Sequence, residues 1–425
     1  MPWEDGGSPH GDGCSREDMS VTIALGSERN STFILTVLIS SLLMIMEGID
    51  IQVLGIVAPS LMPSLGINKA DTGTIFAMTQ AGGVIGAILG GYISDHWGRR
   101  NALFASVAIF AASTLLTVLA TGYWSMLFIR TIAGFGIGAA VPNVVGLALE
   151  AAPAKHRIKA VTVVMAGMPI GGAGISIFAA AAMERFGWQS LFYIGGFGPL
   201  LLLPLLFRVP NRKIEPRAPK ASGGFSTVKT LFSRELRPVT TLVWLIFFLT
   251  AAMMYLFLNW LPTLMTEKSF DITVGQTAAF WFNLGCVGGG WIMGPMVDRF
   301  GAKVVLPFGY SLFLASLLGM GLTNDLLPIL ICITAIGFSL MGSYYCLNGV
   351  TGMLYPEEMR GLGVGAALAV GRVGSIIGPL TAGYILQAGG GAGTIITSMI
   401  PSVLIAMVAI IALMMRQSRA SRQKA

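Results

Sequence analysis

The chain has 425 residues, of which 54% are hydrophobic and only 11% are charged, and its formal net charge is +7. A soluble chain of this length would have roughly a quarter of its residues charged, so the composition excludes a soluble globular protein. The mean hydropathy of +0.75 indicates an integral membrane protein instead. The four cysteines and three histidines are scattered and show no metal or redox spacing. We therefore expect no metal site, no cofactor and no disulfide framework.

Apolar stretches recur along the whole chain, and each is long enough to cross ~30 Å of hydrocarbon as a helix. We predict twelve such spans, at residues 32–61, 72–94, 101–120, 124–150, 158–183, 188–207, 238–264, 273–297, 303–323, 326–353, 361–388 and 393–415. A polar tail over residues 1–30, without the basic region of a signal peptide, precedes them, and a basic tail over residues 416–425 follows. The predicted fold class is therefore an all-α integral membrane protein with twelve transmembrane helices.

Lysine and arginine are unequally divided between the two sides of such a bundle. One side holds both tails, the loop 208–237 and the basic residues after the second and fourth spans, whereas the opposite loops hold only Lys69, Arg185 and Lys268. Because basic loops stay in the cytoplasm, we expect a multi-pass protein of the inner or plasma membrane with both termini cytoplasmic. The positive charge thus indicates topology and contact with membrane lipid, not binding of nucleic acid.

The loop 208–237 is rich in Pro, Lys and Arg, and it separates two predicted six-helix bundles over residues 31–207 and 238–415. The bundles match in sequence at a constant offset of 203 residues. Gly91, Asp95, Gly98 and Arg100 correspond to Gly294, Asp298, Gly301 and Lys303, Pro153 and Arg157 to Pro356 and Arg360, and Pro59 to Pro262. This tandem duplication predicts two pseudo-symmetric bundles with a substrate site between them near the membrane midplane.

Two carboxylates lie in the middle of the first predicted span, in "MIMEGIDIQV". Glu47 and Asp50 are spaced i, i+3, so they are neighbours on one face of a helix. Burial and mutual repulsion both favour the protonated form of a carboxylate, which makes the pair a candidate for proton coupling. In the alternative interpretation, hydrogen bonds cap both groups and the acids only fix helix packing.

Arg372 lies in the middle of the eleventh predicted span, in "VGRVGS". Its planar guanidinium can bind a carboxylate through two parallel hydrogen bonds, so we expect it to bind an anionic substrate. The alternative is a structural ion pair with a buried acid. These deep charges are not repeated in the other half. The corresponding residues are Thr250 for Glu47, Met253 for Asp50 and Pro169 for Arg372. We therefore predict that a substrate anion bridges the halves, and that protonation of the acids changes its affinity.

Several motifs resemble a known family. "GGYISDHWGRRN" resembles the loop signature of the major facilitator superfamily, with a degenerate copy after the eighth span, and "RTIAGFGIGAAVPN" resembles its arginine- and glycine-containing helix. Within it, "EGID", "NWLPTL", "YPEEMRGLGVG" and "GRVGSIIGPLTAGYI" resemble the aromatic acid/H+ symporter family, over about residues 32–415. The family pattern begins Asp-Gly-x-Asp, whereas this chain has Glu47. The resemblance implies a proton-coupled importer (symporter) of benzoate-like or hydroxybenzoate-like acids that works by alternating access.

Arg130 lies six residues after Trp124 in the fourth predicted span, so its side chain could extend to the outer surface. The resemblance favours a role in coupling to the acids instead. The loop charges of the two halves are candidates for gating, because charges at helix ends can pair in one state and separate in another; a role in topology alone is the alternative. These residues are Asp95, Arg99, Arg100, Asp298, Arg299 and Lys303.

Aromatic and amide side chains near the expected cavity include Asn143, Trp260, Phe280, Trp281, Tyr344, Tyr345 and Asn348. Small-molecule pockets are mostly apolar with a few placed polar groups, and we predict that Asn143, Tyr344 and Asn348 contribute to substrate binding. The others are more typical of packing or lipid contact.

We therefore predict a transporter and not an enzyme, with a small aromatic carboxylate, protons and membrane lipid as partners, acting as a monomer. The alternatives are a proton-coupled transporter of a non-aromatic organic anion and an exporter of the same fold. A membrane enzyme would need a histidine or cysteine cluster or a nucleophile constellation, which the sequence does not show. A sensor would need polar tails long enough for an output domain.

Overall fold

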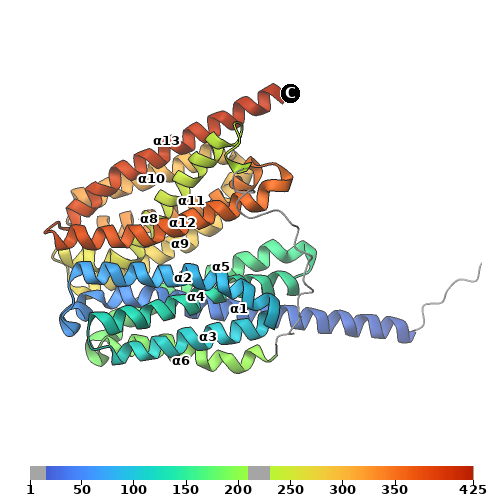
Figure 1. The fold of residues 1–425 in the computed structure, drawn as a ribbon, viewed down its shortest axis with the longest axis horizontal. Helices are drawn as coiled ribbons and strands as arrows, with labels where there is room; N and C mark the ends of the chain where they lie inside the picture. Colours follow the sequence, from blue (N-terminus) through green and yellow to red (C-terminus); the bar gives the residue numbers. More distant parts are fainter. Residues whose placement is uncertain (1–15, 209–229, 425) are drawn as a thin grey trace, which may run out of the picture.

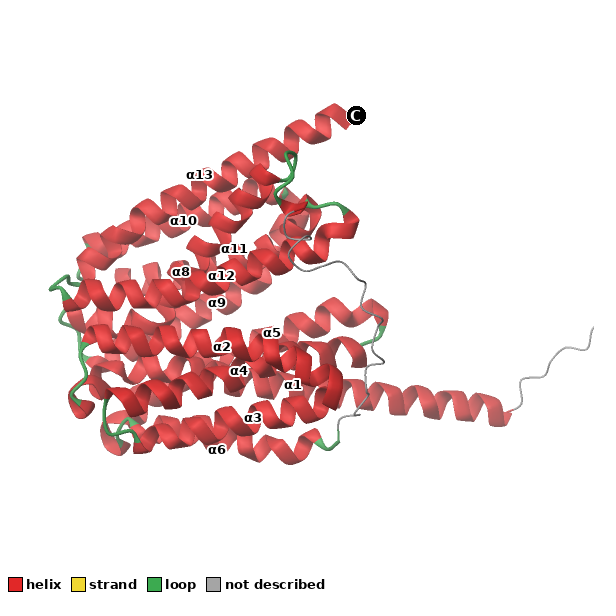
Figure 2. Cartoon of the chain, in the orientation of Figure 1, coloured by secondary structure: helices red, strands yellow, loops and turns green. Residues whose placement is uncertain are grey.

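The computed structural model describes residues 16–208 and 230–424, without the side chains of residues 16–32, 154, 158 and 417–424. These ranges form helices joined by short turns, and no strand occurs in them (Figure 2). The N-terminal half contains α1 (Arg16–Leu65), α2 (Lys69–Trp97), α3 (Arg99–Leu116), α4 (Tyr123–Ala151), α5 (Arg157–Phe186) and α6 (Gln189–Leu206). The C-terminal half contains α8 (Arg237–Glu267), α9 (Ile272–Phe300), α10 (Ala302–Leu322), α11 (Leu326–Leu354), α12 (Arg360–Gln387) and α13 (Ala392–Lys424). Short 3-10 helices lie between them: η1 (Thr117–Leu119), η2 (Ala154–His156) and η3 (Glu357–Met359).

Each of the twelve predicted spans is found as a helix. Within the described ranges, eleven of these helices are long and apolar enough to cross a membrane, and α9 is not among them. Part of the predicted polar tail over residues 1–30 is helical, because α1 begins at Arg16 and continues into the first span. Most of the predicted loop 208–237 lies outside the described residues.

The two halves lie side by side, with α1–α6 in one bundle and α8–α13 in the other (Figure 1). We call the side where α6 ends and α8 begins the linker side, and the opposite side, where α1 and α8 end, the far side. The bundles diverge toward the linker side (Figure 1). Arg99, Arg157 and Arg360 begin helices on the linker side, which is therefore the predicted basic side.

The sequence duplication is also a duplication of helix packing. In both halves, glycines of one helix contact backbone carbonyl groups of a neighbour so closely that a Cβ would overlap them. The contacts are Gly82 with Thr131, Gly86 with Phe135, Gly285 with Thr334 and Gly289 with Phe338. The second two pairs follow the first two by 203 residues. The α2–α4 crossing thus recurs as the α9–α11 crossing, and small residues permit the close approach.

The turns at the linker-side ends of α2 and α9 are equivalent as well. Gly98 has a φ of 83° and Gly301 a φ of 81°. A residue with a Cβ is strained in this region, whereas glycine adopts it readily. The repeated glycine therefore explains why the loop signature keeps this residue in both of its copies.

On the far side the two halves are in contact. Lys69 Nζ lies 2.7 Å from Glu267 Oε1, and the Trp260 and Phe76 rings pack nearly at right angles with 5.3 Å between their centroids. The buried apolar cluster that contains Trp260 extends across both halves. A second cluster, near the linker side, contains only residues of the N-terminal half. Burial of apolar surface thus joins the halves on the far side.

A buried amide pair also joins α1 to α9. Gln52 Nε2 donates to Asn283 Oδ1 at 2.6 Å, and Asn283 Nδ2 donates to Gln52 Oε1 at 2.7 Å. Gly172 of α5 leaves room for this pair, because a Cβ there would overlap the Gln52 amide. Separating the pair would leave buried polar groups unpaired, so it holds the two halves together beside the cavity described next.

Candidate functional site

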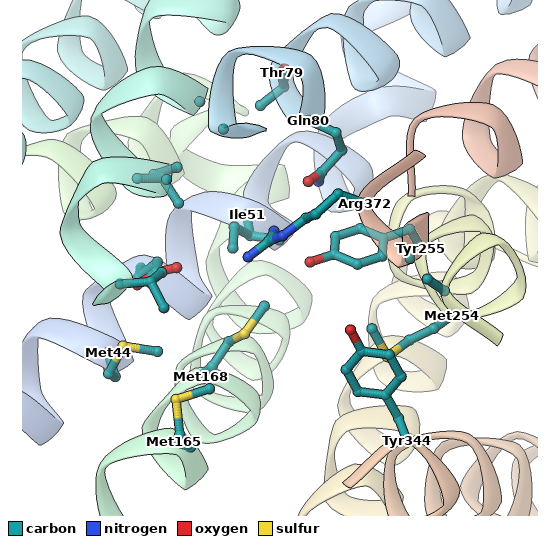
Figure 3. A pocket seen from close by; sticks show the side chains of 18 of the residues that line it. Met44, Ile51, Thr79, Gln80, Met165, Met168, Met254, Tyr255, Tyr344 and Arg372 are labelled. Carbon is teal, nitrogen blue, oxygen red and sulfur yellow. The ribbon is translucent and has the colours of Figure 1, made fainter. Parts of the chain in front are cut away.

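A cavity of about 860 Å³, its open part included, lies between the two halves. Helices α1, α2, α4 and α5 line it from one half, and α8, α11 and α12 from the other (Figure 3). Its wall is mostly apolar and contains five methionines and three tyrosines: Met44, Met165, Met168, Met254, Met341, Tyr255, Tyr344 and Tyr345. The cavity lies where the tandem duplication predicts a substrate site.

Arg372 of α12 is the cationic residue of the cavity wall. Its guanidinium extends across the cavity toward α1 and lies beside the hydroxyl of Tyr255, with which it interacts (Figure 3). Gly374 and Gly378 let α12 pack closely on α8, because a Cβ at either position would overlap the backbone of α8. This packing fixes the helix that carries Arg372 against the helix that carries Tyr255. No ion pair of Arg372 is found within the described ranges, so its fork remains available to an anion.

Glu47 of α1 lines the same cavity and is only 3% exposed. Gly48 lets α1 approach α5, because a Cβ there would overlap the carbonyl group of Met168. The Glu47 carboxylate interacts electrostatically with Arg372 and with Asp50. No hydrogen bond to this carboxylate is found in the part of the chain that the structure describes. Glu47 is therefore a buried acid that faces the cavity and interacts electrostatically with Arg372.

Asp50 has a different environment. Arg130 Nη1 and Nη2 donate to its two carboxylate oxygens at 3.1 Å each, and Thr114 Oγ1 donates to Oδ1 at 2.5 Å. Arg130 and Asp50 are both 0% exposed, and the guanidinium carbon lies 5.8 Å from the centroid of the Phe192 ring. Arg130 thus does not extend to the outer surface. The two acids that we predicted as neighbours interact, but Asp50 is fixed by an ion pair within the N-terminal bundle whereas Glu47 faces the cavity.

The predicted amides are not brought to the cavity. Asn143 Nδ2 donates to the carbonyl oxygens of Ala139 at 2.9 Å and Gly90 at 3.5 Å, and Asn348 Nδ2 donates to the carbonyl oxygen of Tyr344 at 2.8 Å. Neither residue lines the cavity. An asparagine within a helix can satisfy itself on the carbonyl group one turn earlier, which is what both do. Tyr344, the third residue of that prediction, does line the cavity.

The other aromatic residues considered for the cavity lie in different environments. Tyr345 lines the cavity, whereas Trp260 packs in the far-side contact and donates from Nε1 to the carbonyl oxygen of Pro379 at 2.9 Å. Trp281 is 37% exposed on the outer surface of the bundle, and Phe280 packs against its ring. Packing and outer-surface roles therefore account for three of the four.

The predicted gating charges differ between the halves. Arg99 Nε lies 2.5 Å from Glu150 Oε1 and joins α3 to α4, and Arg100 packs over the ring of Phe207 with 5.9 Å to its centroid. Asp95 is exposed. The equivalents of this loop in the second half are exposed and form no ion pair within the described ranges: Asp298, Arg299 and Lys303. The gating role of these charges stays a prediction.

Three polar residues of the cavity, Thr79, Gln80 and Tyr255, were missed by sequence reasoning. Gln80 of α2 and Tyr255 of α8 both point into the cavity (Figure 3). Being neutral, they do not stand out in an apolar helix as a charge does. A signal was available in the duplication, because the offset of 203 relates Gln80 to Asn283 and Tyr255 to Gln52. Polar residues at equivalent positions of both halves lie at the same depth in the two bundles, which could have indicated the cavity.

Comparison with known proteins agrees with this architecture. The family model of the Major Facilitator Superfamily matches residues 40–293 and 263–425. The 3-(3-hydroxy-phenyl)propionate transporter of Escherichia coli strain K12 is 34% identical over 393 residues, which cover 92% of this chain and 97% of that protein. The gallate transporter of Pseudomonas putida is 29% identical over 380 residues, covering 82% of this chain and 84% of that protein.

Solved structures show the same fold. The nucleoside transporter NupG has a TM-score of 0.75 at 12% identity, covering 90% of this chain and 99% of that one. A D-xylose-proton symporter has a TM-score of 0.73 at 18% identity, covering 89% of this chain and 97% of that one. At such low identity the likeness concerns the fold alone.

The chain therefore belongs to the Major Facilitator Superfamily. It is a multi-pass membrane transporter and not an enzyme, as predicted, and the predicted two-bundle helical fold is confirmed. Several of its curated relatives within the superfamily are transporters of aromatic acids by name, which confirms the resemblance to the aromatic acid/H+ symporter family.

Proposed function

We propose that this transporter is a proton-coupled symporter that imports a small aromatic carboxylate by alternating access. The observation that carries the proposal is Arg372, a guanidinium without an ion pair in the described ranges, in an apolar cavity between the halves. An arginine fork is well suited to a carboxylate. The names of the relatives support an aromatic acid as the substrate.

The rest of the wall suits an aromatic ring. Methionine side chains fill irregular space and form favourable contacts between sulfur and aromatic rings. Met44, Met165 and Met168 line the side opposite Tyr344 (Figure 3). A ring held between the two would extend from a carboxylate bound at Arg372. In this arrangement one substrate touches both halves at once, and its binding depends on how they are oriented.

Glu47 is the proposed proton carrier. Its carboxylate and the substrate carboxylate compete for the positive charge of Arg372, since Glu47 and Arg372 interact electrostatically. An anion at Arg372 weakens the stabilisation of ionised Glu47 and favours its protonated form. By linkage, a proton on Glu47 must favour the anion equally. Substrate and proton therefore bind together, and the loaded site carries no additional charge.

Asp50 and Arg130 have a supporting role in this proposal. Their buried ion pair holds α1 against α4 within one turn of Glu47. It also keeps a fixed negative charge beside Glu47, with which Asp50 interacts. Like charges favour protonation of the more weakly stabilised member of a pair, and here that member is Glu47, because the Arg130 fork stabilises Asp50.

The test is uptake into proteoliposomes that contain the purified protein. With an inward proton gradient, radiolabelled benzoate or 3-hydroxybenzoate should accumulate above its equilibrium level, and an uncoupler should abolish the accumulation. Arg372→Gln should abolish uptake, whereas the control Arg185→Gln, at an exposed position at the far-side end of α5, should retain most of it. Accumulation that does not respond to the proton gradient, or uptake restricted to non-aromatic anions, would contradict the proposal.

A further inference from the structure

The cavity contains a polar side chain that the proposed mechanism does not use. Gln80 of α2 is only 8% exposed, and its amide points into the cavity beside Arg372 (Figure 3). No hydrogen bond to this amide is found within the described ranges. A glutamine side chain offers two donor hydrogens and one acceptor oxygen, and buried polar groups are normally satisfied by the protein, by water or by a ligand.

The internal duplication shows what is unusual about Gln80. Its equivalent in the C-terminal half is Asn283, and the equivalent of Tyr255 is Gln52. Gln52 and Asn283 form a closed pair through two hydrogen bonds across the halves. The symmetry-related residues Tyr255 and Gln80 form no such pair within the described ranges, and the Tyr255 hydroxyl points toward Arg372 instead (Figure 3). Of the two equivalent contacts, one is thus made by hydrogen bonds between protein side chains. At the other, the Gln80 amide faces the cavity without a hydrogen bond from the described part of the protein.

There is also room beside this amide. Gly83 lines the cavity one turn further along α2, and a Cβ at this position would meet no atom closer than 3.5 Å. This differs from Gly82 and Gly86 on the same helix, where a Cβ would overlap the backbone of α4. Gly83 is therefore not required by helix packing, and its lack of a side chain leaves space on the cavity side of Gln80.

We propose that Gln80 is a specificity-determining residue that hydrogen-bonds a hydroxyl group on the substrate ring while Arg372 holds the carboxylate. This inference rests on the proposed transport of aromatic carboxylates. A phenolic hydroxyl is both donor and acceptor, so it can bond either end of the amide. An unsubstituted ring cannot hydrogen-bond the amide, and it excludes the water molecule that would otherwise form this hydrogen bond. The transporter therefore prefers hydroxylated aromatic acids to the unsubstituted acids of the same size.

The experiment compares matched acids: benzoate with 3-hydroxybenzoate, and 3-phenylpropanoate with 3-(3-hydroxyphenyl)propanoate. Dissociation constants are measured by calorimetry on the purified protein, whose folding is checked by thermal unfolding. In the wild type, the hydroxylated acid of at least one pair should bind about tenfold more tightly. In Gln80→Met, which keeps the length of the side chain without its amide, that preference should disappear because only the hydroxylated acid loses affinity. Gln80→Leu should give the same result.

Thr79→Val is the matched control. Thr79 also lines the cavity, but its hydroxyl already donates to the carbonyl oxygen of Ile75 at 2.8 Å, so this variant should keep the preference. An equal loss of affinity for both members of a pair in Gln80→Met would overturn the inference, because it would show that Gln80 only positions Arg372. A wild type that binds the two members equally would also overturn it. A wild type that binds none of the four acids would contradict the proposed function itself.

Discussion

The two halves of the molecule share their helix packing but not their buried charges. The N-terminal half has a hydrogen-bonded cluster of Asp50, Thr114 and Arg130. At the equivalent positions the C-terminal half has Met253, Leu317 and Ile333, all buried and apolar. Because the same glycine-mediated packing forms around either set, the fold does not need the charged cluster. Its presence in one half only is better explained by function than by stability.

The C-terminal half has its own unmatched charge, because Arg372 corresponds to Pro169. In our account the C-terminal half thus binds the anion and the N-terminal half handles the proton. A coupled cycle then needs both halves to meet at one cavity. Substitutions in either half, or at the contacts between the halves, should therefore have different effects on stability and on binding.

The largest effect should come from breaking the buried ion pair. Arg130→Ile leaves the Asp50 carboxylate buried without its partner, which should lower the free energy of unfolding by about 3–5 kcal/mol. A triple variant, Asp50→Met with Thr114→Leu and Arg130→Ile, installs the residues of the other half. It should regain most of the lost stability, because apolar replacements of buried ion pairs are often neutral. Thermal unfolding in detergent measures both.

The triple variant also separates stability from function. We expect it to fold but to lose proton-driven accumulation of substrate, since the fixed charge beside Glu47 is gone. A triple variant as unstable as Arg130→Ile would show that the N-terminal fold needs the cluster. This result would contradict our inference that the cluster is present for function and not for stability.

The next largest effect should follow a change at Arg372. Arg372→Gln removes the charge and should weaken substrate binding about 100-fold or more, in line with the cost of about 2–5 kcal/mol for removing one partner of a buried charge pair. Arg372→Lys keeps the charge without the planar fork, so it should recover only part of the affinity. Calorimetry with 3-hydroxybenzoate measures both. Full affinity in Arg372→Gln would move the anion site elsewhere in the protein.

A smaller effect should follow the loss of the amide pair between the halves. Gln52→Ala leaves Asn283 Oδ1 without the donor from which it accepts at 2.6 Å, although Asn283 Nδ2 still donates to the carbonyl oxygen of Ala279. This loss should destabilise the contact by about 1–3 kcal/mol. A double-mutant cycle with Asn283→Ala should show a coupling of about 1 kcal/mol in thermal unfolding. Additive effects of the two substitutions would mean that the pair does not hold the halves together.

The smallest effect should come from the far-side ion pair. Lys69 and Glu267 are partly exposed, so Lys69→Gln should change the free energy of unfolding by less than about 1 kcal/mol, and less still at high salt. The exchanged variant, Lys69→Glu with Glu267→Lys, should restore the wild-type value. A loss of several kcal/mol on Lys69→Gln would indicate a role beyond a surface pair.

The fold could be predicted almost completely from the sequence. Membrane spans follow from long apolar stretches, and the constant offset identifies the duplication that the repeated glycine contacts then display in space. The charged members of the site were also evident, since Glu47 and Arg372 interrupt apolar helices. Neutral members were harder to recognise. Gln80 is recognised only when the cavity is seen, and Asn143 turned out to bond its own helix, because the spacing of residues does not say which carbonyl group an amide will reach.

The distinct environments of the two acids lead to the most direct test of coupling. Substrate affinity of the wild type should fall as the pH rises, because Glu47 loses its proton and then competes with the substrate for Arg372. The decisive measurement is the dissociation constant for 3-hydroxybenzoate against pH in Glu47→Gln, which keeps a neutral side chain at every pH. Our account predicts that the affinity of this variant no longer changes with pH above the range in which the substrate itself ionises. An undiminished pH dependence in Glu47→Gln would contradict it.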